Sequence, residues 1–143
     1  MKVENHLRPN GAQMAGFADG ASDGPIYMLN LLNLLKYRDK AEYADGRDTK
    51  LTGRQAYAVY TQGVRELLQE FGGPLTLKAS VKRLTIGEVE ELWDDVAIAM
   101  YPSRAAMLQM MQSEKMQDIG QHRAAGLDGQ LNIECVDATG SWF

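Results

Sequence analysis

The sequence has one cysteine and only two histidines among its 143 residues. The single thiol, Cys135, cannot form an internal disulfide, so nothing in the chain indicates an oxidising compartment. His6 and His122 are the only imidazoles, and no cluster has the ligand spacing of a structural zinc site. We therefore predict neither a disulfide scaffold nor a bound metal.

Long apolar runs and basic stripes are also missing. Nowhere do about 18 apolar residues follow one another, so no membrane span is predicted. The N-terminal segment, residues 1–17, lacks the continuous apolar core of a signal peptide. A net charge of −4, with no Lys/Arg stripe between aromatic residues, argues against a nucleic-acid groove. We expect a cytoplasmic protein with neither nucleic acid nor membrane as a partner.

Several catalytic and nucleotide-binding motifs are absent as well. The chain contains no GxGxxG and no GxxxxGK[ST], which leaves dinucleotide and P-loop nucleotide binding without support. No GxSxG nucleophile motif occurs. We predict no cofactor. What the chain does have is 45% hydrophobic and 24% charged residues, which is typical of a soluble globular domain of this length.

The pattern divides the chain into an N-terminal extension, residues 1–24, and a single domain, residues 25–143. A short helix is expected within the extension, near residues 10–17. Residues 26–36 then read as a strand, because Gly and Pro bound the run and no helix cap precedes it. A helix remains the alternative there, since Leu and Met are good helix formers.

Five further elements follow from periodicity and from their start and stop signals. They are a helix over 53–71, an edge strand over 75–87, a strand over 95–101, a helix in two pieces over 103–125 and a last strand over 129–138. Thr52 is the expected N-cap of the first long helix, and Ser113 that of the second piece. In the edge strand, alternation predicts one shared face for Leu75, Leu77, Ala79 and Val81.

The element order β-α-β-β-α-β predicts an α+β, ferredoxin-like domain with an antiparallel sheet. The first and third strands are apolar on both faces, as central strands are, whereas the second and fourth alternate, as edge strands do. Both helices cover one sheet face in this fold, which leaves an apolar face open. A second copy packed sheet against sheet would cover it, so we expect a homodimer.

The same topology gathers polar and aromatic residues at one end of the sheet, where a cleft between sheet and helices is the expected ligand site. The candidate ligand-binding residues are Asn33, Arg54, Tyr60, Trp93 and Arg123, and the candidate acid–base residues are Asp94 and His122. Structural alternatives stand beside these roles. The helix dipole alone favours His122 and Arg123 at a helix end, Trp93 can cover the core, and Asp94 can cap a turn or join an ion pair.

Several motifs in order resemble a known family. They are LNLLKYRDKAEYADG, TGRQAYAVY, the pair Gly72-Gly73, WDDVAIAMYPS and QHRAAGL, spread over roughly residues 25–137. Together they are similar to the DUF1330 family of small bacterial proteins. The resemblance implies a dimeric α+β barrel, in which ferredoxin-like domains pair sheet to sheet. It implies little about activity, because the family is functionally uncharacterised.

Two functions fit these observations. The first is an enzyme, or a ligand-binding protein, that acts on a small, partly apolar organic molecule in the cleft without metal or nucleotide. The alternative is a non-catalytic ligand-binding or protein-interaction module. A catalyst needs a titratable group inside the cleft, whereas a binding module does not.

Overall fold

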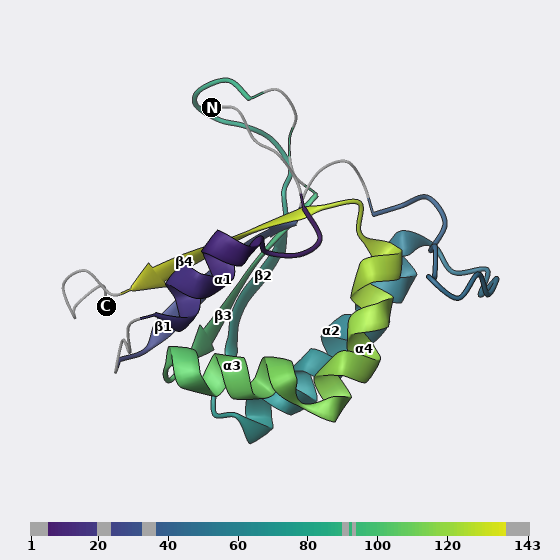
Figure 1. Cartoon of the computed structure of the whole chain (residues 1–143). Helices are drawn as coiled ribbons and strands as arrows, with labels where there is room; N and C mark the ends of the chain where they lie inside the picture. Colours follow the sequence, from purple (N-terminus) through teal and green to yellow (C-terminus); the bar gives the residue numbers. More distant parts are fainter. Residues whose placement is uncertain (1–5, 20–23, 33–36, 90–91, 93, 137–143) are drawn as a thin grey trace.

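The computed structural model describes residues 6–19, 24–32, 37–89, 92 and 94–136, and they form an antiparallel sheet with helices on one side (Figure 1). The elements are α1 (Gly11–Ala18), β1 (Ile26–Leu32), α2 (Gly53–Glu70), β2 (Leu75–Ser80), β3 (Asp95–Tyr101), α3 (Arg104–Gln112), α4 (Glu114–Gly126) and β4 (Gln130–Val136). Residues 33–36, the last part of the predicted first strand, lie outside the described residues.

The sheet order is β2-β3-β1-β4, and every neighbouring pair is antiparallel. The predicted ferredoxin-like topology is therefore confirmed, with the first and third strands in the centre. Hydrophobic content selects this order, because only strands that are apolar on both faces can be covered on both sides.

Two helices begin at the N-caps that the sequence predicts, and the N-terminal helix has a cap of the same kind. Thr52 caps α2, and its hydroxyl accepts a hydrogen bond from the backbone N–H of Gln55. Ser113 ends α3 and caps α4, which divides the second helical segment into two pieces as predicted. Asn10 caps α1 in the same way, through the backbone N–H of Gln13. These caps satisfy N–H groups that have no partner inside their helices.

The main core lies between the sheet and the helices. One face of the two central strands contributes Ile26, Met28, Ala99 and Tyr101, which pack against the buried side chains of α2 and α3: Leu67, Leu68 and Met110. Residues directly opposite across a strand pair share a face, so the register Met28↔Ala99 and Met28↔Glu134 fixes which residues of β3 and β4 face the helices. We call this side the helix face and the other the open face.

Helices α2 and α4 lie side by side (Figure 1), and their backbones come into contact at two glycines, Gly53 and Gly126. A Cβ atom added at Gly126 would lie 2.4 Å from the carbonyl oxygen of Gly53. The backbone N–H of Arg38 donates to the carbonyl of Gly126, and that of Gly53 donates to the carbonyl of Arg38. The end of α4, the start of α2 and the chain leading into α2 are thus joined backbone to backbone.

One prediction about the edge strand is wrong. Leu75 is opposite Ala99 on the helix face, but Leu77 is opposite Ile98 on the open face. A register shift between Leu75 and Leu77 places these two leucines on opposite faces, because an irregularity of this kind interrupts the alternation of side chains.

None of the described helices is both long enough and apolar enough to cross a membrane.

Candidate functional site

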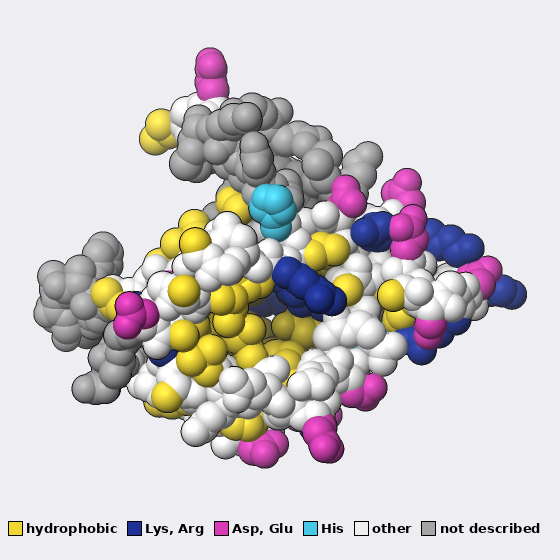
Figure 2. All heavy atoms as spheres, in the orientation of Figure 1, with side chains coloured by type: hydrophobic (Ala, Val, Ile, Leu, Met, Phe, Trp, Pro, Cys, Tyr) yellow, Lys and Arg dark blue, Asp and Glu magenta, His cyan; other side chains and the backbone are white. Residues whose placement is uncertain are grey.

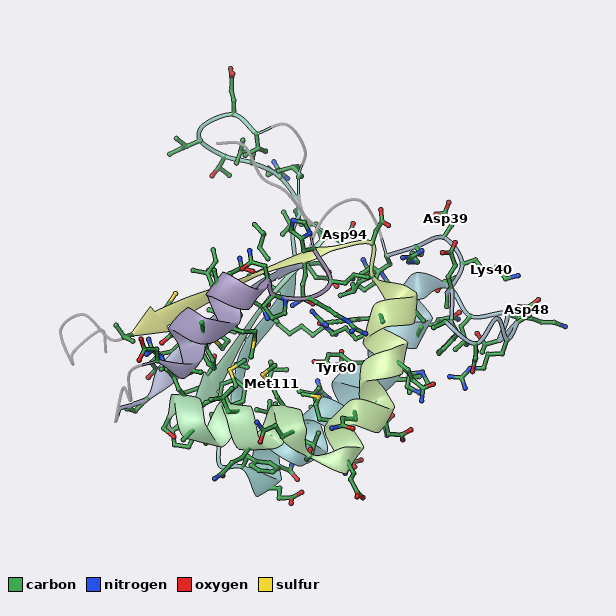
Figure 3. All side chains as sticks on the ribbon, in the orientation of Figure 1. Asp39, Lys40, Asp48, Tyr60, Asp94 and Met111 are labelled. Atoms are coloured by element: carbon green, nitrogen blue, oxygen red, sulfur yellow. The ribbon has the colours of Figure 1, made fainter. Side chains whose placement is uncertain are left out.

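A cavity of about 420 Å³ lies between the helix face of the sheet and helices α1, α2, α3 and α4. Its volume falls in the range of small-molecule pockets. The space-filling view shows a hollow there with mostly hydrophobic walls and a basic side chain beside it (Figure 2). Tyr60 of α2 and Met111 of α3 lie around this interior. Asp39, Lys40 and Asp48 lie away from it, beyond the start of α2 and the end of α4 (Figure 3).

Methionine is the most frequent residue of the cavity lining. Six of the eight methionines line the cavity: Met14, Met28, Met107, Met110, Met111 and Met116. They come from α1, β1, α3 and α4, so they surround the cavity rather than form one stripe. Unbranched thioether side chains adapt to the shape of what they contact. A wall of this kind can fit apolar ligands of different shapes.

A line of polar side chains crosses the cavity wall along β4. Arg123 Nε donates to Gln130 Oε1 at 2.7 Å, and Gln130 Nε2 donates to Asn132 Oδ1 at 2.6 Å. Gln130 is a buried polar residue, and its amide is held at both ends. Because β4 alternates, its polar face carries these groups on the helix face, while Ile133 and Cys135 lie on the open face.

Three tyrosines complete the polar lining: Tyr57 and Tyr60 from α2, and Tyr101 from β3. Burial raises the pKa of all three phenols above the ordinary value near 10, although the charge of Arg123 opposes this for Tyr57 and Tyr60. The hydroxyls therefore stay protonated at neutral pH and can donate hydrogen bonds. The rings of Tyr57 and Tyr60 pack against each other, with centroids 5.4 Å apart and ring planes tilted by 43°.

Glu134 is the carboxylate of the lining, and it has a cationic partner. Arg104 Nε lies 2.8 Å from Glu134 Oε1, and both side chains are partly buried. The guanidinium of Arg104 also lies 5.8 Å from the ring of Phe17 in α1. The negative charge of the cavity wall is thus balanced locally.

The N-terminal segment covers part of the cavity. His6 forms an isolated antiparallel bridge with Gln130, through the backbone N–H of Gln130 and the carbonyl of His6. Helix α1 then contributes Gln13, Met14 and Phe17 to the lining. No residue of α1 is fully buried. Its Phe17 is partly buried and packs against the main core.

A second polar cluster surrounds Asp95, at the end of the sheet that holds the start of α2. Asp95 is only 2% exposed and accepts hydrogen bonds from Tyr37 Oη, from Ser80 Oγ at 2.8 Å and from Arg54 Nη1 at 3.1 Å. Burial by itself would raise the pKa of Asp95, but these hydroxyl bonds and the positive charges of Arg54 and Lys78 outweigh it and lower that pKa. Asp95 is therefore ionised at neutral pH.

The sequence-predicted site residues separate into different surroundings. Tyr60 and Arg123 line the large cavity. Arg54 and Asp94 line a smaller, more open hollow beside Tyr37. His122 lies against Tyr43, with 2.7 Å between its Nδ1 and the tyrosine hydroxyl, and belongs to neither lining.

The described residues therefore do not bring Asp94, His122 and Arg123 into one cavity. Asn33 and Trp93 lie outside the described residues. The long polar loop, residues 38–52, packs on the ends of α2 and α4 through Ala41 and Tyr43 and does not line the large cavity.

Sequence reasoning missed Gln130, Asn132, Glu134 and Tyr101 as cavity residues. The alternation of β4 placed Asn132 and Glu134 on one face, but a polar face of an edge strand ordinarily faces water. One signal in the sequence could have indicated the arrangement. The other face of β4 is apolar and belongs to the apolar open face of the sheet, so the polar face of β4 must lie toward the helices and the cavity. The N-terminal helix carried no comparable signal.

Among the residues that the structure describes, no group of three or more His, Cys, Asp or Glu side chains could hold a metal ion. The polar groups of the cavity include Arg123, the two amides of β4, the phenols, Glu134 and the exposed His6, and its apolar wall is rich in methionine.

No protein-family model matches the chain, and no curated protein does. Among solved structures, RPA0582, a protein of unknown function from Rhodopseudomonas palustris, is 31% identical, with a TM-score of 0.83, and the match covers 95% of this chain and 99% of that one. The methylated form of RPA0582 gives 32% identity and a TM-score of 0.84 over 96% and 98% of the two chains. Protein At3g17210 of Arabidopsis thaliana is 14% identical, with a TM-score of 0.48 over 82% and 98% of the chains. At this identity and coverage, the chain belongs to the family of the Rhodopseudomonas palustris protein RPA0582.

Proposed function

We propose that this protein is a small cytoplasmic homodimer that binds or converts a small, partly apolar organic molecule in the cavity between sheet and helices, without metal or nucleotide. The observation that carries the proposal is the lining itself. Methionines from four elements surround a space of about 420 Å³, and a few oriented polar groups lie on one wall. Apolar walls with few, fixed polar groups are typical of small-molecule sites.

Binding is the better supported half of this proposal. Phenols with raised pKa values are poor general bases at neutral pH, and Glu134 is held by Arg104. Among the described lining residues, His6 is then the remaining candidate for a general base, and it is exposed. The alternative, a non-catalytic binding or interaction module, uses the same cavity.

Filling part of the cavity should weaken ligand binding. Gly120 lies in α4 and lines the cavity, and a Cβ atom added there meets nothing within 4 Å. Gly120→Phe should weaken binding of naphthylacetamide, a neutral aromatic probe, by about tenfold or more, because the ring takes the ligand's place. Calorimetric titration measures this. Gly16→Phe in α1 is the matched control, since Gly16 is exposed and does not line the cavity. Equal probe affinity in the two variants would contradict the assigned site.

The homodimer is the second part of the proposal. The resemblance to the DUF1330 family supports it, because that resemblance implies a dimeric α+β barrel. The open face presents apolar side chains from all four strands, and Leu77 and Ile133 are each 44% exposed. A large exposed apolar patch indicates an interaction surface. A second copy brings a surface of the same character, so the two open faces would pack against each other.

Ile133→Asp should separate the dimer. A carboxylate buried between two apolar sheets lacks a partner, so we expect the dissociation constant to rise about 100-fold. Sedimentation velocity over a concentration series measures it. Val59→Asp, on an exposed position of α2, makes the same kind of change outside the sheet and should leave the assembly unaltered. A wild-type protein that is monomeric at every concentration would refute the dimer.

A further inference from the structure

The guanidinium of Arg123 has unused hydrogen-bonding capacity inside the cavity. Its Nε donates to Gln130, and the described part of the chain contains no carboxylate paired with it. The two terminal nitrogens together carry four further N–H donors. A cation with this geometry binds a carboxylate through two parallel hydrogen bonds. Arg123 is thus a charged group with no carboxylate partner among the described residues, on the polar side of a cavity whose other walls are apolar.

Two tyrosine hydroxyls in the cavity also lack a hydrogen-bond partner among the described residues. Tyr57 is 8% exposed and Tyr101 is 5% exposed, and both line the cavity. Neither hydroxyl has a hydrogen-bond partner among the described residues, whereas the buried hydroxyl of Tyr37 bonds to Asp95. Buried polar groups are ordinarily hydrogen-bonded, so a hydroxyl that faces a cavity without a partner indicates an acceptor that enters with the ligand.

The distribution of charge favours an anion over a cation. Glu134 would be the partner of a cationic ligand, but Arg104 already neutralises it. Arg8 adds a second positive charge to the lining, and it is exposed. The wall therefore carries an excess of positive charge, located on Arg123 and Arg8.

We infer that the ligand is an organic anion of the carboxylate class, whose charged group lies against Arg123 and the hydroxyls of Tyr57 and Tyr101. Its apolar body contacts the methionines of α3, including Met107 and Met110. This inference rests on the proposed function, because it assigns the ligand class of the same cavity. Gln130 holds the guanidinium in place from β4 and is a positioning residue.

The experiment compares two probes that differ in charge alone: naphthylacetate and the neutral naphthylacetamide. Calorimetric titration at pH 7 of wild-type protein should show naphthylacetate binding at least about tenfold more tightly. Arg123→Met, which keeps the aliphatic stem, should remove this preference while amide binding stays within about threefold. Arg47→Met is the matched control, because Arg47 contacts Tyr43 and Gln121 outside the cavity. It should keep the preference.

Removal of a hydroxyl tests the second contact. Tyr57→Phe and Tyr101→Phe should each weaken naphthylacetate binding by about three- to tenfold. Tyr27→Phe is the control, because Tyr27 lies on the open face. A thermal melt of each variant verifies that it is folded before titration.

The outcomes separate the two claims. If neither probe binds the wild-type protein, the proposed function fails together with this inference. If both probes bind equally and Arg123→Met changes neither, the cavity remains a binding site and the anion inference is overturned. If Arg47→Met removes the preference as well, the effect is general surface charge, which also overturns it.

Discussion

Asp95→Ala is expected to lower the free energy of unfolding by about 3 kcal/mol, because three hydrogen bonds converge on this buried carboxylate. Its loss leaves the hydroxyl of Tyr37, which is itself buried, without an acceptor. Arg54 is 56% exposed, so water can solvate its guanidinium once Asp95 is removed. The loss of unfolding free energy is therefore smaller than for a fully buried ion pair. Urea unfolding at pH 7 measures the change.

The pH dependence of the Asp95 contribution has a defined sign. Its pKa is lower in the folded protein than in the unfolded chain, where it is about 3.9. The stabilisation by ionised Asp95 is therefore complete above that unfolded value and is lost as the pH falls through the folded value. The difference in unfolding free energy between wild type and Asp95→Asn should be constant from pH 5 to 7 and shrink below about pH 4.

Asp118→Ala provides the control, because Asp118 lies exposed on α4 and accepts a single bond from Gln121. It should change the unfolding free energy by no more than about 0.5 kcal/mol. An Asp95→Ala variant as stable as this control would mean that the cluster around Asp95 adds nothing to stability.

Gly126→Ala is expected to destabilise the fold by about 3 kcal/mol. The added methyl group would meet the carbonyl oxygen of Gly53 at 2.4 Å and the backbone nitrogen of Tyr57 at 2.9 Å. Both are backbone atoms, so the start of α2 and the end of α4 would have to move apart. Chemical denaturation measures the loss.

Gly120→Ala, in the same helix, should have the opposite sign. Nothing lies within 4 Å of a Cβ atom there, and Ala stabilises a helix interior relative to Gly by roughly 0.5–1 kcal/mol. The two variants make the same chemical change, so their difference isolates the contact between α2 and α4. Two glycine variants of equal stability would contradict the close approach of these helices.

Much of the fold could be predicted from the sequence, because local signals and the hydrophobic pattern agree. Thr52 and Ser113 mark the helix starts, and apolar residues on both faces of β1 and β3 place these strands in the centre. The alternation at Leu75 and Leu77 gave a wrong prediction of their faces, because an irregularity in strand register cannot be recognised from the hydrophobic pattern.

The candidate site was less predictable, because topology determines which end of the sheet a residue lies at but not which cavity its side chain enters. Tyr60 and Arg123 line the main cavity, yet His122, one residue before Arg123, turns toward Tyr43. Adjacent positions on a helix point about 100° apart, so neighbours along the chain do not share a site. The side-chain amide of Gln130 is held by Arg123 and Asn132. Its backbone pairs with His6, a contact between distant parts of the chain that no local pattern indicates.

The methionines allow the most direct test of the assigned cavity. Six of them line it, whereas Met100 does not and lies on the open face of β3. In a protein labelled with ¹³C at the methionine methyl groups, titration with naphthylacetate should shift the signals of the cavity methionines, such as Met107, Met110 and Met116. The signal of Met100 should stay in place. A titration that moves Met100 and leaves the cavity methionines unchanged would show that the ligand binds elsewhere.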